Sequence, residues 1–376
     1  MRVICNTDFL GRKLALVSRG VSPRSTIQIL GGILLEAGEE VVRLSSMDME
    51  LSIQTSSPAE VEEQGRVVIP ARIFNDVVRS LSKEDLTLVH DSAEGVVRLS
   101  ARENEYCIRA YPGEDFPQLP KFDEAGAFKV GGEALVETVE KVSRSYSRDD
   151  TRPALTGILI SFEGPRVRMV TTDSYRLSIK ETELVTTFDG SREAIIPARA
   201  MQEVSRIFSS SDEEQVEVVL SENQALFRIG DVLFGTRLIE GNFPEYKRLL
   251  PTTFEREISV SREELIETLR RVSFFTQRQT PPVPVSLAFS KGAVEISVRN
   301  GEVGEAHERL PATSEDEFHI LFNPSYLLDG VSAVNSEKVL FKLNEPLKPG
   351  LIVPETGGEE PDFLYLITPM RDQSRS

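Results

Sequence analysis

The chain has 376 residues, 40% of them hydrophobic, which is enough to bury several cores and to form two to four domains. No apolar run approaches the length of a membrane-spanning helix and no secretory leader is evident, so we expect a cytosolic protein. Two cysteines without a CxxC or Cys/His cluster argue against a disulfide framework and a zinc site, and no cofactor is expected. The formal net charge of -17 by itself argues against nucleic-acid contact, which needs Lys and Arg.

The predicted elements, taken in chain order, recur three times. Each segment is predicted to hold a short strand, a helix, several strands, a second helix near a proline and further strands. Alternating apolar and polar residues predict strands, as at residues 166–170 and 294–298. Capping residues, acidic first turns and prolines predict helices over residues 7–24, 71–82, 132–148, 198–208, 262–278 and 324–336.

Short motifs confirm that the segments are related. VIPAR at residues 68–72 recurs as IIPAR at 195–199 and, more weakly, as LFNPS at 321–325, so that the three prolines are 127 residues apart. DFP at 115–117 and NFP at 242–244 each follow 47 residues after one of these prolines. The repeat predicts an α+β fold of three domains. Their boundaries are expected at residues 1–122, 128–250 and 256–376, with linkers near 119–127 and 250–256.

Five further motifs carry a family resemblance: the paired IPAR segments, RPALTG at 152–157, TDSYRL at 172–177, FPEY at 243–246 and YLITPMR at 365–371. With them the chain resembles the bacterial DNA polymerase III beta subunit, or beta sliding clamp, over nearly its whole length. The resemblance implies three DNA-clamp domains, helices lining a central hole, antiparallel sheets outside and a head-to-tail dimeric ring. It also implies a non-catalytic processivity factor of DNA replication that encircles duplex DNA.

The charges of the predicted helices differ from those of the remaining residues. The six predicted helices together carry +5, which leaves -22 for the remainder. A weakly basic hole inside an acidic exterior would give salt-sensitive, non-sequence-specific contact with double-stranded DNA. For any one of these residues a solvated helix position is the alternative. The residues expected to face DNA are Arg24, Arg72, Arg79, Lys141, Arg144, Arg148, Arg199, Arg206, Arg270, Arg271 and Arg278.

The resemblance places a peptide-binding cleft between the second and third domains. Leucine, proline and methionine would supply an apolar groove, and arginines would supply charged hydrogen bonds. Core packing is the alternative for Leu155, Leu177 and Ile367. Many family members have Gly-His where this chain has Ser174-Tyr175, and most lack a tail such as residues 372–376. The cleft positions are Arg152, Leu155, Thr172, Ser174, Tyr175, Arg176, Leu177, Pro244, Arg248, Leu249, Pro349, Leu366, Ile367, Thr368, Pro369, Met370 and Arg371.

The resemblance also implies that Tyr106 and Ile108 of one chain meet Phe274 and Phe275 of the next, although all four could instead belong to internal cores. The implied partners are a second copy, the DNA polymerase III alpha subunit, the clamp loader and other proteins with clamp-binding motifs. The implied location is the cytoplasm, at the nucleoid and not at a membrane.

Three other functions are possible for a chain of this kind. An enzyme is the main alternative, but no phosphate-binding loop, HExxH, nucleophile elbow or dinucleotide fingerprint is present. A peptide-binding scaffold without a closed ring remains possible, because repeats alone do not define a closed geometry. A sequence-specific DNA-binding regulator is the least favoured, because it would need a concentrated basic reading helix.

Overall fold

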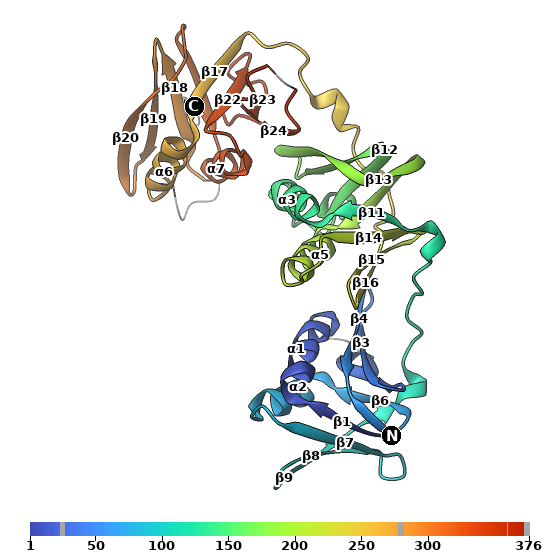
Figure 1. Ribbon diagram of the computed structural model, residues 1–376. Coiled ribbons are helices and arrows are strands. Elements are labelled where there is room, and N and C mark those ends of the chain that lie inside the picture. Colours follow the sequence, from blue (N-terminus) through green and yellow to red (C-terminus); the bar gives the residue numbers. More distant parts are fainter. Residues whose placement is uncertain (23–26, 277–281, 359, 372–376) are drawn as a thin grey trace. The chain divides into compact units, whose positions relative to one another are not determined.

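The computed structural model, shown in Figure 1, describes residues 1–22, 27–276, 282–358 and 360–371. These residues form two compact units, Met1–Glu133 with Glu203–Leu238, and Ala134–Gln202 with Ile239–Ser376. The division passes through the middle repeat because its residues 215–237 join a sheet of the first unit, whereas its residues 157–197 join a sheet of the second.

The first unit contains the whole first repeat together with the first strand and the last three strands of the second. Its helices are α1 (Thr7–Val17) and α2 (Ala71–Ser80), with short 3-10 turns η1 (Ser18–Gly20), η2 (Gln28–Gly31), η3 (Gly113–Asp115) and η4 (Glu124–Gly126). Its strands are β1 (Arg2–Asn6), β2 (Gly32–Ala37), β3 (Val41–Met47), β4 (Leu51–Pro58), β5 (Glu60–Glu63), β6 (Gly65–Pro70), β7 (Asp85–Asp91), β8 (Val96–Ala101), β9 (Asn104–Arg109), β10 (Tyr111–Pro112), β11 (Phe128–Gly131), β14 (Gln215–Leu220), β15 (Gln224–Ile229) and β16 (Val232–Arg237).

Two antiparallel sheets build this unit. One has the order β5-β1-β7-β8-β9, and the other has the order β10-β6-β2-β3-β4-β16-β15-β14-β11. The second sheet is continuous across two repeats because β4 pairs with β16, where Ile53 lies opposite Phe234. Helices α1 and α2 pack side by side. Their apolar faces point into the core, where Leu10, Leu14 and Phe74 are fully buried.

The second unit contains the long hairpin of the middle repeat and the whole last repeat. Its helices are α4 (Pro153–Thr156), α6 (Arg262–Ser273) and α7 (Pro324–Ala333), with η5 (Tyr246–Leu249); residues of α3 (Gly132–Val142) and α5 (Ala198–Ser209) fall in both units. Its strands are β12 (Gly157–Thr172), β13 (Arg176–Pro197), β17 (Arg256–Ser261), β18 (Val285–Ser290), β19 (Ala293–Asn300), β20 (Gly304–Pro311), β21 (Phe318–Phe322), β22 (Lys338–Leu343), β23 (Gly350–Pro354) and β24 (Phe363–Ile367).

This unit repeats the plan of the first. One sheet has the order β12-β13-β24-β23-β22-β17, and the other has the order β20-β19-β18-β21. Here β13 pairs with β24, where Ser178 lies opposite Tyr365. Helices α6 and α7 pack together over a core that includes Leu269 and Leu327, which are fully buried.

Three predicted helices end five or more residues before their expected ends, whereas α2 and α7 end two and three residues early. Helices α1, α3 and α6 all stop at or beside a Val-Ser pair, at Val17, Val142 and Ser273. In α1 and α6 a serine hydroxyl competes with the helical backbone for hydrogen bonds, as when Ser18 Oγ donates to the Leu14 carbonyl at 2.6 Å. The predicted spans 7–24, 132–148 and 262–278 are therefore too long at their C-terminal ends.

Within the described parts of the chain, no helix is both long enough and apolar enough to cross a membrane. Nor do these residues include a group of three or more His, Cys, Asp or Glu side chains placed to hold a metal ion. Cys5 is buried, which raises its pKa to about 12, whereas Cys107 is exposed; both are free thiols.

Candidate functional site

The turn between β12 and β13 is built by its own side chains. Asp173 Oδ1 accepts hydrogen bonds from the backbone N–H groups of Tyr175 at 2.9 Å and Arg176 at 3.0 Å. Thr172 Oγ1 donates to the Arg176 carbonyl at 2.7 Å and accepts from Ser174 N at 3.1 Å. These bonds hold Ser174 at a φ of 82°, a region that side chains other than glycine rarely occupy.

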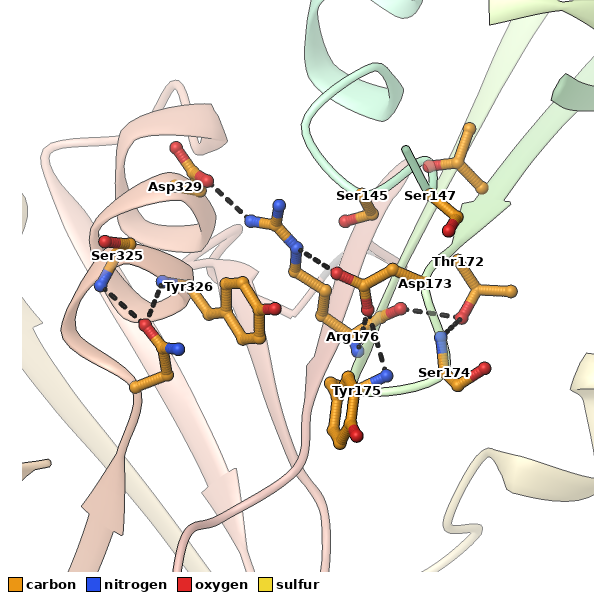
Figure 2. Close-up of polar contacts among 12 residues, drawn as sticks. Ser145, Ser147, Thr172, Asp173, Ser174, Tyr175, Arg176, Ser325, Tyr326 and Asp329 are labelled. Carbon is orange, nitrogen blue, oxygen red and sulfur yellow. Dashed lines mark hydrogen bonds and ion pairs between the residues drawn. The ribbon is translucent and has the colours of Figure 1, made fainter. Parts of the chain in front are cut away.

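The Arg176 side chain fastens this turn to helix α7, as Figure 2 shows. Its Nε donates to Asp173 Oδ2 at 3.0 Å, and its Nη1 donates to Asp329 Oδ2 at 2.5 Å. The guanidinium also lies 4.2 Å from the centre of the Tyr326 ring. Arg144 Nη1 is 3.6 Å from the other Asp329 oxygen, so this carboxylate lies between two arginines. The Asp329 side chain is 35% exposed, so water as well as the two arginines stabilises its charge.

The Tyr365 phenol completes the network beneath Arg176. Its hydroxyl donates to the Tyr326 carbonyl at 2.8 Å. Burial raises the pKa of Tyr365 well above the ordinary value, so the phenol stays neutral. Burial alone would lower the pKa of Arg176, but the neighbouring Tyr365, Asp329 and Asp173 outweigh it and raise that pKa. The arginine therefore keeps its charge.

Arg152 is held against the same turn from the other side. Its Nη1 donates to Ser174 Oγ at 2.9 Å, and its Nε donates to Asp149 Oδ2 at 2.9 Å. Hydrogen bonds from Thr151 and then from Arg152 lower the pKa of Asp149, so it is ionised at neutral pH. The buried Ser145 and Ser178 share a hydrogen bond of 2.7 Å that ties this segment to β13.

The last described residues are fixed at the turn as well. Thr368 N donates to the Tyr175 carbonyl at 2.9 Å, and Met370 N donates to the Leu321 carbonyl at 2.7 Å. These bonds connect the C-terminal segment to both β21 and the middle repeat. Residues 368–370 are half-buried, so this segment is part of the site and does not fray.

Apolar side chains line the floor beside these polar groups. Leu177 and Leu366 lie opposite each other on β13 and β24, and both pack with Tyr246 in one buried cluster. Farther along the same strands lies a cavity of about 870 Å³, with Ile179 and Leu250 among its lining residues. The turn thus has a buried apolar cluster next to it and arginines fixed around it by hydrogen bonds.

The residues predicted for peptide binding fall into three groups. Arg152, Thr172, Ser174, Tyr175, Arg176 and Thr368 are joined by the hydrogen bonds above. Ile367 is fully buried in the core of the last repeat, which is the packing alternative that the sequence left open for it. The remaining positions are the buried Leu155, Leu177 and Leu366, the half-buried Pro349, Pro369 and Met370, and the exposed Pro244, Arg248, Leu249 and Arg371. The tail of residues 372–376 lies outside the described residues.

The structure changes the charge prediction. Helices α1 to α7 as they fold carry no net charge, so the predicted +5 on the helices is wrong. The excess comes from five arginines beyond the helix ends: Arg19, Arg24, Arg144, Arg148 and Arg278. The net positive charge thus comes from positions just after the first helix of each repeat, because basic and acidic residues cancel within the helices themselves.

Individual residues predicted to face DNA differ in availability. Arg72, Arg79, Arg148, Arg199 and Arg270 are exposed and form no ion pair with any described residue. Four of the eleven form ion pairs with acidic side chains, and two lie outside the described residues. The Lys141 side chain is 8% exposed and pairs with Glu137 at 2.7 Å, so it has little surface free for a phosphate. Arg144 pairs with Asp329, Arg206 with Glu203 and Arg271 with Glu308, whereas Arg24 and Arg278 lie outside the described residues.

The four residues predicted for a dimer contact lie at two different places. Tyr106 and Ile108 are on β9 at the edge of its sheet; Tyr106 is half-buried and Ile108 is buried. Phe274 follows α6 and is 67% exposed, whereas Phe275 packs against the core of the last repeat. Only Phe274 therefore presents a large free apolar surface.

Sequence reasoning missed Asp173, Tyr326, Asp329 and Tyr365 as parts of the site. A signal existed for Asp329, because it is the one charged residue of α7. A charged residue on an otherwise uncharged, core-facing helix usually has a specific partner. Its partner Arg176 is 153 residues away along the chain, and no local pattern connects the two.

Three family models match consecutive parts of the chain. They describe the N-terminal, central and C-terminal domains of the DNA polymerase III beta subunit and match residues 1–120, 129–245 and 247–371. The chain is also similar to the beta sliding clamp of Streptomyces coelicolor, with 32% identity over 385 residues that cover 99% of each chain.

Solved structures give the same result. The DNA polymerase sliding clamp from Bacillus subtilis has a TM-score of 0.93 and 27% identity, and the match covers 99% of both chains. A DnaN sliding clamp from Bartonella birtlesii bound to griselimycin has a TM-score of 0.91 and 27% identity, and the match covers 99% of this chain and 100% of that one.

Proposed function

Because the chain belongs to the DNA polymerase III beta subunit family, we propose that two copies close head to tail around duplex DNA and hold partner peptides at the turn of residues 172–176. The chain is a DNA sliding clamp with three clamp domains, and it serves as a non-catalytic processivity subunit. The observation that carries the proposal is that all three domain models match in order along one chain.

Support for ring closure comes from the two junctions between repeats. At each junction the last strand of one repeat, β16 or β24, pairs with a strand of the preceding repeat, β4 or β13. In the first repeat the strand that corresponds to β16 and β24 is β9, and in the last repeat the strand that corresponds to β4 and β13 is β20. Both β9 and β20 lie at a sheet edge. Edge strands present unpaired backbone groups to another strand. Pairing of β9 with β20 of a second copy, formed twice, closes a ring of two chains.

The predicted dimer residues fit this contact unequally. Tyr106 occupies on β9 the position that Phe234 occupies on β16 and Tyr365 on β24, and these two are fully buried at the internal junctions. Tyr106 is only half-buried, as expected of a residue that a second copy would cover. The exposed Phe274 supplies apolar surface on the receiving side, while Ile108 and Phe275 support the two surfaces from within.

The peptide site is centred on the turn of residues 172–176. Tyr175 and Leu249 are 61% and 54% exposed and offer apolar contact, and Arg152 and Arg248 offer hydrogen-bond donors. Leu155, Leu177 and Leu366 form the floor. The ligands are short peptide segments of the polymerase III alpha subunit, the clamp loader and other clamp-binding proteins. The griselimycin-bound Bartonella clamp supports a ligand site in this family.

DNA contact is assigned to the five predicted arginines that are exposed and form no ion pair with a residue that the structure describes. Arg72, Arg79, Arg148, Arg199 and Arg270 are free to approach phosphates, and the acidic remainder of the chain repels duplex from other surfaces. Contacts of this kind carry no base information, so binding is not sequence-specific. A clamp on chromosomal DNA would lie in the cytoplasm at the nucleoid.

The deciding experiment loads the full chain onto nicked circular DNA with a clamp loader and then linearises the DNA. A ring stays on the circle and is lost from free ends, because topology and not affinity retains it. Equal retention on both forms would show direct gripping of DNA. A native mass equal to one 41.9 kDa chain at micromolar concentration would also contradict the ring.

A further inference from the structure

The contact between copies brings together three charged side chains, and we propose that Arg271 of one copy binds the Glu103 carboxylate of the other while it also holds its own Glu308. The inference rests on the head-to-tail dimer proposed above. It follows from the chemistry of the two junctions inside the chain, which the contact between copies repeats.

At each internal junction a carboxylate stands one residue before the incoming strand. Asp231 precedes β16, and its Oδ2 accepts from Lys13 Nζ at 2.6 Å and Thr55 Oγ1 at 2.7 Å. Asp362 precedes β24 and forms a short ion pair with Lys180. In both cases the receiving repeat supplies a donor that meets the acid.

Glu103 occupies the same place before β9. The residue preceding it, Arg102, has a φ of 49°, and the residue preceding Asp231, Gly230, has a φ of 56°, so the two turns share a backbone form. Glu103 is exposed and has no hydrogen bond or ion pair with any residue that the structure describes. Its equivalents at the internal junctions, Asp231 and Asp362, are both paired, whereas the Glu103 carboxylate can still accept a hydrogen bond from a donor.

The receiving position on β20 is Glu308. It lies opposite Ile296, as Thr55 lies opposite Leu44 and Lys180 lies opposite Met169. These three pairs fall at equivalent places in the three repeats. The hydroxyl or ammonium donor of the internal junctions is therefore replaced on β20 by a second carboxylate.

Helix α6 compensates for this replacement. Thr268 corresponds on α6 to Lys13 on α1, because it stands four residues before Val272 and Lys13 stands four residues before Val17. The Thr268 hydroxyl donates to Glu308 Oε2 at 3.1 Å. Arg271 Nε and Nη2 donate to the two Glu308 oxygens at 2.9 and 2.6 Å. Its Nη1 is 3.8 Å from Glu267, beyond hydrogen-bond distance, and so retains donors for another acid.

The register predicts how the acid arrives. Phe234 lies opposite Ile53 and Tyr365 opposite Ser178, so Tyr106 is expected opposite Ala306 of the second copy. Glu103 then reaches the end of the Glu308 side chain, where two carboxylates share one guanidinium. The same register sets Arg309 opposite Glu103, but successive side chains of a strand point to opposite faces, so Arg309 lies on the other face of β20 from Glu308. On the face of Glu308, Arg271 is the cation between the two acids, which would repel each other without it.

The test is a double-mutant cycle on the dimer dissociation constant, measured by dilution with mass photometry. Arg271→Ala should raise the constant about tenfold or more, because it leaves two acids facing each other. Glu103→Gln alone should change it by about twofold or less, yet in the Arg271→Ala background it should recover about fivefold. Glu105→Gln, the same charge change two residues along the chain, should recover nothing.

A second pair of variants avoids any loss of folding through Arg271. Glu308→Gln frees the guanidinium for Glu103 and should tighten the dimer about two- to fivefold, and adding Glu103→Gln should cancel that gain. Equal effects of Glu103→Gln in all backgrounds would overturn the inference while leaving the dimer intact. A wild-type chain that stays monomeric would instead contradict the proposed function.

Discussion

Arg176 and Asp329 are joined by a hydrogen bond of 2.5 Å that fastens the turn of residues 172–176 to helix α7. The Arg176 side chain is 12% exposed and has a carboxylate on each side, Asp173 from its own turn and Asp329 from the last repeat. The position of the turn is therefore set by both repeats. A peptide bound there depends on the integrity of the junction between them.

Loss of Asp329 should weaken both the fold and the site. Asp329→Ala leaves Arg176 with one acid and removes the partner of Arg144, so we expect the free energy of unfolding to fall by about 1 kcal/mol or more. Affinity for a clamp-binding peptide of the polymerase alpha subunit should fall about threefold to tenfold, measured by fluorescence anisotropy. Glu245→Ala, which breaks only the exposed pair with Arg248, is the control and should leave the unfolding midpoint unchanged.

Ser174 combines backbone strain with a useful hydroxyl. Ser174→Gly removes strain worth about 1 kcal/mol but also removes the acceptor of Arg152. We expect unchanged or higher stability in urea unfolding together with peptide affinity reduced about two- to fivefold. Ser174→Ala keeps the strain and loses the hydroxyl, so it should lose both stability and affinity. Full affinity in the glycine variant would show that the Arg152 contact has no role in binding.

The C-terminal segment should matter for partners and not for assembly. Removal of residues 369–376 eliminates the bond from Met370 N to the Leu321 carbonyl and exposes the floor at Leu366. We expect weaker binding of the polymerase alpha subunit in surface plasmon resonance, with the native mass still that of the dimer. Unchanged polymerase binding would remove the segment from the site.

Asp231 should make the first unit sensitive to acid. Burial raises its pKa, but hydrogen bonds from Lys13 and Thr55 and the charge of Lys13 outweigh burial, so the pKa lies below the ordinary 3.8. A lowered pKa in the folded state gives stability that is present above the unfolded pKa and is lost as pH falls through the folded value. Asp231→Asn should therefore be less stable than wild type at about pH 7, with the difference shrinking below about pH 4. Urea unfolding at several pH values measures this, and a constant difference would contradict it.

Arg148 and Lys141 should have opposite roles despite their similar positions in the sequence. Arg148→Gln removes an exposed cation and should lower retention on circular DNA at moderate salt without changing stability. Lys141→Gln breaks the pair with Glu137 and the contact of the ammonium over the Phe363 ring, so it should lower the unfolding midpoint and leave DNA retention unchanged. Salt-dependent retention and thermal unfolding of both variants separate these effects. Loss of retention in the lysine variant alone would contradict the structural role.

Local patterns accounted for much of the fold. The spacing of Pro70, Pro197 and Pro324 indicated three repeats, and alternating residues located strands such as β19. Helix ends were harder, because Ser18 and Ser145 make hydrogen bonds with distant or preceding groups that no periodicity displays. The charge assigned to the helices followed from those overlong ends and was wrong for the same reason.

The sequence by itself determined the threefold repeat and the family, because recurring motifs and their spacing can be recognised without the fold. Tertiary structure alone decided that Arg176 meets Asp329, that Lys141 is buried and that Ile367 belongs to a core. Those outcomes depend on which faces of β13, β24 and α7 come together. Pairing between strands far apart in the chain has no local signature, so burial and charge pairing at such junctions appear only when the chain is folded.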